Sequence, residues 1–371
     1  MKQAVKGAWR LISLFGIGIY VHWTFLLLFI YLGLSQAYLK SGFESTVLLF
    51  LLVLAVFATV VLHELGHALT ARRYGCTTRD IVLLPIGGMA RMDRLPDVPK
   101  EEVYVSLAGP LVNVILAVLI YVFFFIDSGV PAFSVMSELT IRNWMAHFYY
   151  ANVVLALFNL IPAYPMDGGR ILHGLLSLRL DRLKATRVAV RIGQLIAMIM
   201  ILSGLYSNAI LAFVGVFVLL AAQMELTQSI SREFLRGAKV KDVIMPNMDA
   251  VAADSTLREV VDQLLHTQTE RFVVFKGDLP VGTIDRKLLF EEIGLHGQDV
   301  FVETCMRRGI QTAEADDPLE KVFASMQADQ TALLLVKENG SFKGYLDFEN
   351  IMEFVSYRQS LRKHATVALH A

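Results

Sequence analysis

Three titratable residues lie at the end of a long apolar run. In VVLHELGHALTARR, residues 60–73, His63 and His67 are four positions apart, and Glu64 stands between them. Residues four apart on a helix share a face, so both imidazoles can direct a nitrogen to one point. A catalytic zinc needs such ligands, a third protein ligand, an open position for water and a carboxylate that accepts the proton of the water. The pattern predicts a zinc centre with Glu64 as the general base.

The same pattern also arises by chance on helices, so its surroundings decide how it is interpreted. The run that precedes His63 is apolar and almost free of charge. Ionisable groups at membrane depth are costly unless they are paired or bound to a metal, and they usually serve a function. A membrane location therefore favours the metal interpretation.

A third ligand has to come from another element at the same depth. Asp167, in FNLIPAYPMDGGR at residues 158–170, is the comparable acidic residue. Pro162 and Pro165 end a helix there, and the two glycines after Asp167 permit a tight bend that can turn its carboxylate toward the metal. In the alternative interpretation Asp167 only caps the next helix.

Composition separates a membrane region from a soluble one. The 371 residues are 55% hydrophobic and 18% charged, with a mean hydropathy of +0.53. The apolar excess fills residues 11–225, and the remainder has an ordinary charge density. Formal net charge is zero, so no electrostatic argument supports a nucleic-acid partner. We expect a polytopic α-helical membrane protein followed by a soluble domain.

Hydropathy predicts about six transmembrane helices. The predicted spans are 11–34, 47–71, 103–126, 144–166 and two within 188–225, which a hairpin near Gly204 and residues 206–208 divides. The basic and then apolar N-terminus lacks a small-residue cleavage site, so we interpret it as a retained first span.

Basic residues predict the orientation of these spans. One side would carry Lys2, Lys6, Arg10, Arg72, Arg73, Arg79, Arg91, Arg94, Lys100, Arg170, Arg179, Arg182, Lys184, Arg187, Arg191, Arg232, Arg236, Lys239 and Lys241. The opposite loops hold Lys40 and Arg142. Both termini are therefore expected in the cytosol, with the chain in the cell (inner) membrane. The same count brings the two motifs to one cytosolic level, and it puts Cys76 and Cys305 on the reducing side.

HELGH and NLIPAYPMDGG resemble the two motifs of the site-2 protease family of intramembrane zinc metalloproteases. The resemblance extends over residues 11–225. It implies one Zn²⁺ per chain, with the ligands His63, His67 and Asp167, the catalytic Glu64, and Asn159 and Pro165 beside the substrate. Many relatives carry Leu where this chain has Met166, a conservative change.

Two other polar residues lie in the predicted spans. SLAGPLVNVILA, at residues 106–117, is similar to the third span of this family, and its Asn113 is expected to make a hydrogen bond to a neighbouring helix or to a ligand. His22 is interpreted as an interfacial histidine beside Trp23 or, alternatively, as an occluding partner near the metal, and it is not counted as a ligand.

The connection DIVLLPIGGMARM, at residues 80–92, is β-branched at its start and contains Gly87 and Gly88. It is either a hairpin whose edge adds an unwound substrate as a further strand or a plain amphipathic connector. The family resemblance favours the hairpin.

Residues 239–358 contain an internal repeat of two similar units. Met245 matches Met306, Leu257 matches Leu319 and Gly282 matches Gly344. Each unit predicts a leading turn, an amphipathic helix, two short strands and a closing helix. The pair resembles tandem cystathionine-β-synthase (CBS) domains, with an α+β βαββα order in each repeat. The expected domains are a metalloprotease at 1–235 and CBS repeats at 236–298 and 299–371.

The CBS resemblance implies an adenine-nucleotide site, which two departures put in doubt. Where such repeats usually place Thr or Ser and then Asp, this chain has Asp285 with Leu288, and Asp347 with Asn350. Carboxylates repel phosphate, so a structural, dimerising or substrate-docking role is favoured for the pair.

The predicted function is intramembrane cleavage of membrane-tethered substrates within transmembrane segments, near the cytosolic face. The bilayer, a membrane protein substrate and a second copy held through the CBS pair are the expected partners. Two alternatives stay open at this point. One is a CBS-regulated membrane transporter or ion exporter, and the other is a metalloprotease of a different lineage with Glu225 as ligand in place of Asp167.

Overall fold

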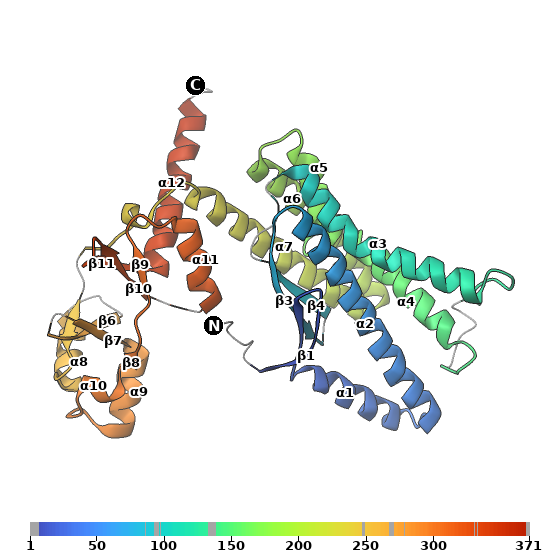
Figure 1. The fold of residues 1–371 in the computed structure, drawn as a ribbon, viewed down its shortest axis with the longest axis horizontal. Coiled ribbons are helices and arrows are strands. Elements are labelled where there is room, and N and C mark those ends of the chain that lie inside the picture. Colours follow the sequence, from blue (N-terminus) through green and yellow to red (C-terminus); the bar gives the residue numbers. More distant parts are fainter. Residues whose placement is uncertain are drawn as a thin grey trace. The chain divides into compact units, whose positions relative to one another are not determined.

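A computed structural model of the chain describes residues 7–368, apart from 86, 93–95, 97, 133–138, 247–248, 267–270, 278, 330 and 332. Lys2, Lys6 and Arg94, which contribute to the predicted orientation, lie outside the described residues. The chain divides into two compact units, Met1–Thr227 and Gln228–Ala371 (Figure 1).

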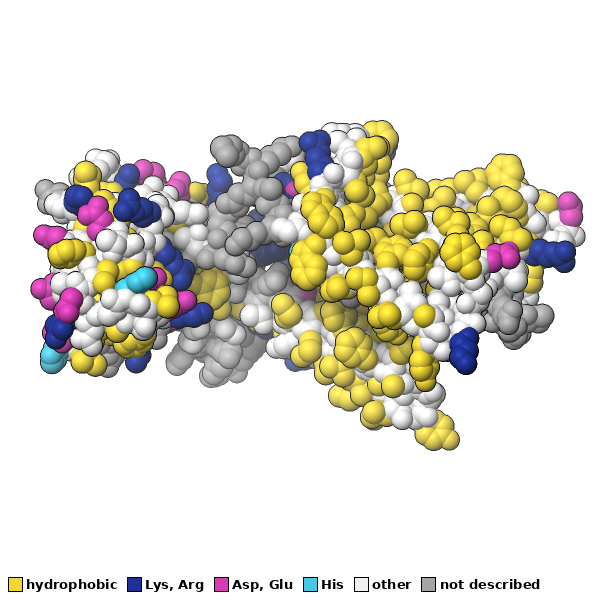
Figure 2. Space-filling view, turned by 90° about the horizontal axis from the view of Figure 1, so that it is seen from below, with side chains coloured by type: hydrophobic (Ala, Val, Ile, Leu, Met, Phe, Trp, Pro, Cys, Tyr) yellow, Lys and Arg dark blue, Asp and Glu magenta, His cyan; other side chains and the backbone are white. Residues whose placement is uncertain are grey.

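The first unit is built from apolar helices. Among the described residues, four are long and apolar enough to cross a membrane: α2 (Phe43–Arg73), α3 (Pro99–Phe124), α6 (Arg182–Ser207) and α7 (Ala209–Leu235). Two shorter helices of 14 and 16 residues are α1 (Phe25–Tyr38) and α4 (Trp144–Asn159). Hydrophobic side chains cover most of the visible face of this unit, whereas acidic and basic side chains are interspersed over the second unit (Figure 2). The division into a lipid-facing and a water-facing region is the one that composition predicts.

The first predicted span is wrong as a single helix. Residues 11–34 instead contribute to strands β1 (Ala8–Leu14) and β2 (Ile17–His22) and to most of α1. Phe15 and Gly16 both have positive φ angles, 52° and 82°, which suit a two-residue hairpin turn. Hydropathy cannot separate an apolar hairpin from a helix, because both consist of apolar residues.

These strands belong to a sheet with the order β1-β2-β3-β4. The predicted hairpin at residues 80–92 is present as β3 (Thr78–Leu84) and β4 (Gly87–Met92), and β2 runs parallel to β3. Arg91 on β4 is hydrogen-bonded to Asp80 on β3, and this bond raises the pKa of the guanidinium. β4 is the last strand of the sheet, so one of its edges has no partner strand among the residues that the structure describes.

Two breaks in the helices shape the rest of this unit. α4 ends at Asn159 rather than at residue 166, and the chain bends through Pro162 and Pro165 before α5 (Asp167–Ser177) begins. Asn208 separates α6 from α7, so the hairpin predicted near residues 206–208 is confirmed. Proline restricts its own φ and has no N–H, and this explains why helix α4 cannot continue into α5.

The second unit contains both βαββα repeats. The first comprises β5 (Ala250–Ala252), α8 (Leu257–His266), β6 (Arg271–Lys276), β7 (Leu279–Asp285) and α9 (Arg286–His296). The second comprises β9 (Thr312–Glu314), α11 (Leu319–Asp329), β10 (Leu333–Glu338), β11 (Ser341–Asp347) and α12 (Phe348–Ala368). Between them lie α10 (Val302–Cys305) and β8 (Arg307–Arg308). The predicted order of elements is confirmed.

The leading segment of each repeat, residues 239–245 or 300–308, binds the other repeat. The backbone bonds from the first segment are Val240 N to Asp317 O, Lys241 N to Ala315 O and Met245 N to Tyr345 O. The second segment is tied by Leu257 N to Val300 O, Val302 N to Ser255 O and Glu303 N to Ala253 O. Val273 of β6 also shares a core with Leu333 and Leu335 of β10. The repeats therefore form one folding unit.

Candidate metal centre

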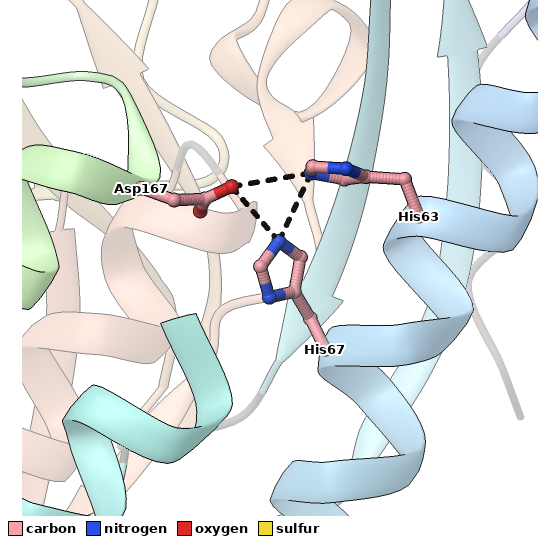
Figure 3. Close-up of side chains that lie close together, drawn as sticks. All are labelled: His63, His67 and Asp167. Atoms are coloured by element: carbon pink, nitrogen blue, oxygen red, sulfur yellow. Dashed lines mark hydrogen bonds and ion pairs between the residues drawn. The ribbon is translucent and has the colours of Figure 1, made fainter. Parts of the chain in front are cut away.

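Helix α2 brings two imidazoles to one point on its buried face. The exposed fractions of His63 and His67 are 7% and 6%. Asp167 is the first residue of α5, and its side chain is 12% exposed. Figure 3 shows both rings directed at the carboxylate of Asp167. His63 Nε2, His67 Nε2 and Asp167 Oδ2 are each 3.1 Å from the other two atoms.

The outer nitrogens of the two rings are held by acceptors on helix α3. His67 Nδ1 lies 2.7 Å from the carbonyl oxygen of Val105, and a carbonyl can only accept. This Nδ1 therefore carries a hydrogen, and the lone pair of the neutral ring is on Nε2. His63 Nδ1 lies 2.7 Å from Asn113 Oδ1, which is an acceptor as well. Both Nε2 atoms thus present lone pairs to the centre.

Three acceptor atoms facing one another fit a cation between them. Two imidazole lone pairs and a carboxylate oxygen repel at 3.1 Å unless a positive charge lies among them. Ligand atoms on a tetrahedral zinc, with bonds of about 2.0–2.1 Å, are separated by roughly 3.3 Å. The triangle is close to this size, and His63, His67 and Asp167 are the group found among the described residues that could hold a metal ion. The donor set fits zinc.

Glycine at position 109 lets helix α3 approach this centre. A Cβ atom on Gly109 would lie 2.2 Å from His67 Nε2 and 2.6 Å from His63 Nε2. Gly66 permits a similar approach between α2 and α3, since its Cβ would meet the carbonyl of Ala108 at 2.8 Å. The two small residues allow Val105 and Asn113 to reach the histidines.

Glu64, which follows His63 on α2, contacts the sheet. Its Oε2 accepts a hydrogen bond of 3.2 Å from the backbone N–H of Ala90 on β4. Gly88 leaves room for this carboxylate, because a Cβ there would lie 3.0 Å from Glu64 Cγ. A backbone N–H on the open edge of β4 therefore faces the carboxylate that follows His63 in the sequence.

A buried ionic cluster holds α5 against α3. Glu102, 3% exposed, lies 2.8 Å from His173 Nδ1 through Oε1 and 3.3 Å from Arg182 through Oε2. His173 is on α5, the helix that begins with Asp167. The cluster fixes the element that carries the third corner of the triangle.

The remaining candidates lie as follows. Asn159 ends α4 and donates from Nδ2 to the carbonyl of Leu155, and Pro165 is exposed in the bend before α5. His22, the last residue of β2, is hydrogen-bonded to Thr24. It is not a member of the group of described residues that could hold a metal ion. Glu225 is on α7, and the group found among the described residues contains Asp167 in its place.

Two features were not predicted as functional from the sequence, Gly109 and Asn152. Gly109 was part of a recognised span, and only the approach of two helices reveals its role. Asn152 is fully buried on α4 and lies 3.5 Å from Asn113 Nδ2. An amide side chain inside an apolar run was the available signal, the same signal that singled out Asn113.

The family described as Peptidase family M50 matches residues 51–144 and 132–200, and the CBS domain family matches residues 301–357. The zinc metalloprotease MJ0392 of Methanocaldococcus jannaschii is 35% identical over 351 residues, which cover 94% of this chain and 96% of the relative. The chain belongs to the M50, or site-2 protease, family of zinc metalloproteases and carries a C-terminal CBS region.

Two further similarities are narrower. Stage IV sporulation protein FB of Bacillus subtilis is 30% identical over 174 residues, which cover 47% of this chain and 52% of that protein. The solved structure of a site-2 protease from Methanocaldococcus jannaschii is 38% identical and covers 59% of this chain and 95% of its own, with a TM-score of 0.44.

Proposed function

We propose that this metalloprotease hydrolyses a peptide bond in or beside a transmembrane segment of a membrane-tethered protein, near the cytosolic face. The observation that supports it most is the triangle of His63 Nε2, His67 Nε2 and Asp167 Oδ2, with sides of 3.1 Å, two corners of which lie on α2, an apolar helix long enough to span a membrane. Ligands at such a depth are costly without a bound ion.

The proposed chemistry divides among four residues. His63, His67 and Asp167 would hold Zn²⁺, which when bound polarises the scissile carbonyl and makes water acidic near neutral pH. Glu64 follows the first ligand and is the carboxylate available to accept the proton of the attacking water. Glu64 would then return that proton to the amine that leaves when the C–N bond breaks.

The open edge of β4 is the proposed binding place for an unwound substrate. Hydrolysis requires a helix to unwind, and its freed amides then need partners inside the membrane. An edge strand offers them by β-addition. The Ala90 N–H already faces Glu64 at 3.2 Å, so a strand paired with β4 would lie beside the proposed base. Asn159 and Pro165 are proposed to contact the same substrate.

The arrangement in the membrane is also part of the proposal. We place both termini in the cytosol of a multi-pass protein of the cell (inner) membrane, because Lys and Arg concentrate in alternate connections. The proposed protease domain is 1–235, followed by CBS repeats at 236–298 and 299–371. The CBS pair would dock the substrate, hold a dimer or regulate cleavage. The transporter alternative is not favoured, because the M50 match covers α2 and α5, the helices that carry the three proposed ligands.

The test is a pair of measurements on Glu64→Gln. This variant should keep zinc, because its three proposed ligands are unchanged, and should lose cleavage, because Gln cannot accept the proton. Zinc content and single-turnover cleavage of a membrane peptide are measured on the same preparation. Near-normal cleavage by Glu64→Gln would exclude Glu64 as the base. A purified parent chain without zinc would contradict the metal site itself.

A further inference from the structure

Three buried amide and carbonyl groups form a chain that leads from α4 to the metal centre. Asn152 Nδ2 lies 2.8 Å from the backbone carbonyl of Phe148, Asn113 Nδ2 lies 3.5 Å from Asn152 Oδ1, and Asn113 Oδ1 lies 2.7 Å from His63 Nδ1. Asn113 and Asn152 are both 0% exposed. The two amide side chains are therefore closed to bulk solvent, whereas Phe148 is half-buried.

The carbonyl of Phe148 gives this chain its direction. A carbonyl only accepts, so Asn152 must turn its NH₂ toward Phe148 and its oxygen toward Asn113. Asn113 then has to present its NH₂ to Asn152 and its oxygen to His63. His63 can satisfy that oxygen only by donating from Nδ1, which leaves the lone pair on Nε2. The reverse direction would set the oxygen of Asn152 against the Phe148 carbonyl, and two buried acceptors would repel.

We infer that Asn152 is a positioning residue of the metal centre, which fixes the tautomer of His63 through Asn113 without touching the metal. This inference rests on the proposed zinc site. His67 obtains the same result in one step, because the Val105 carbonyl accepts directly from its Nδ1 at 2.7 Å. His63 faces a side chain that can rotate by half a turn, so it needs a second amide to define which end points inward.

The length of each link indicates how strongly each residue should act. The Asn113 contact to His63 is short, while the 3.5 Å link from Asn113 to Asn152 is the longest of the chain. Partners of a metal-bound histidine typically change metal affinity about 10–100-fold when removed. We expect Asn113→Leu near the upper end of that range and Asn152→Leu near the lower end, about 10-fold.

The experiment measures apparent zinc affinity of the full-length protein in detergent by competition with a chelator. Asn152→Leu and the smaller Asn152→Ala are compared with Ala146→Val. Ala146 is also 0% exposed on α4, but it lies in the apolar cluster around Ile120 and Phe125. Ala146→Val should lower thermal stability and leave zinc affinity within about two-fold, whereas both Asn152 variants should lower zinc affinity about 10-fold.

A second starting variant, Asn113→Asp, distinguishes an effect of hydrogen-bond direction on zinc affinity from an effect of side-chain packing. In Asn113→Asp either carboxylate oxygen accepts the Nδ1 hydrogen of His63, so the tautomer no longer depends on residue 152. Adding Asn152→Leu to Asn113→Asp should therefore change zinc affinity less than two-fold. An equal loss in both backgrounds, or a loss in Ala146→Val as large as that in the Asn152 variants, would overturn the inference. A parent protein that binds no zinc would instead contradict the proposed function.

Discussion

Replacing Gly109 by alanine tests the approach of α3 to the metal centre. The new Cβ would lie 2.2 Å from His67 Nε2 and 2.6 Å from His63 Nε2, where ordinary contact begins near 3.4 Å. The His67 ring would have to retreat by about 1.2 Å, whereas zinc sites tolerate about 0.2 Å in ligand distance. Both histidines would be displaced together. We expect Gly109→Ala to lower zinc affinity at least about 100-fold, beyond the usual effect of an outer partner.

The higher helix propensity of alanine would stabilise the protein, so it cannot cause the expected loss of zinc affinity. Alanine is favoured over glycine by about 1 kcal/mol in a helix interior, so Gly109→Ala should not weaken α3 itself. Zinc competition and thermal unfolding, measured on one preparation, separate the two effects. Gly215→Ala on α7 is the matched control, because its Cβ would meet Ile201 Cγ1 at 2.8 Å, on the helix pair α6 and α7. Unchanged zinc affinity in Gly109→Ala would refute the close approach of α3.

Three further outcomes are expected. Asp167→Asn should lose zinc while Glu225→Gln retains it, and metal content of the two purified proteins decides between the ligands. ATP, ADP and AMP should bind weakly or not at all to fragment 228–371. Asp285 and Asp347 already accept hydrogen bonds from the N–H groups at the starts of α9 and α12, which a phosphate would need. Micromolar binding measured by calorimetry would contradict this expectation. The hydrogen bonds from Lys239 and Lys241 lower the pKa of Asp316 from 3.8 to about 2. The ionised carboxylate therefore stabilises the fragment at pH values above 3.8, and this stabilisation is lost as the pH falls from 3.8 to about 2. In Asp316→Asn the thermal stability of the fragment should depend less on pH over that range.

Hydropathy predicted the helices well where local composition decides the structure. α2, α3, α6 and α7 lie close to four of the predicted spans. The helix–strand–strand–helix order within each repeat followed from turn residues and periodicity, whereas the leading strand of each repeat was implied by the CBS resemblance. The first span failed because β2 finds its parallel partner only at residues 80–83. Strand pairing between segments so far apart in the sequence does not change the hydropathy pattern of either segment.

At the metal centre, too, features within one segment could be predicted from the sequence, and contacts between distant segments could not. The spacing of His63 and His67 predicts their shared face, and the family resemblance implies Asp167 as the third ligand. The structure adds the contacts that orient them, from Val105, Asn113 and Asn152. These contacts join three helices, α2, α3 and α4, and no single segment of sequence contains them. Gly109 was overlooked because its importance lies in the space that it leaves empty.

The exchanged leading segments of the two CBS repeats have a consequence during synthesis of the chain. The first repeat is completed only when residues 300–308 bind it, through bonds such as Leu257 N to Val300 O. The second repeat in turn needs residues 239–245, which the ribosome releases long before β10 and β11. A nascent chain that stops near residue 298 would therefore expose unpaired backbone at Ser255 and Leu257, although every residue of its own repeat has been made. Quality-control proteases would meet an unfinished first repeat until residues 300–308 emerge, and an unfinished second repeat until β11 follows.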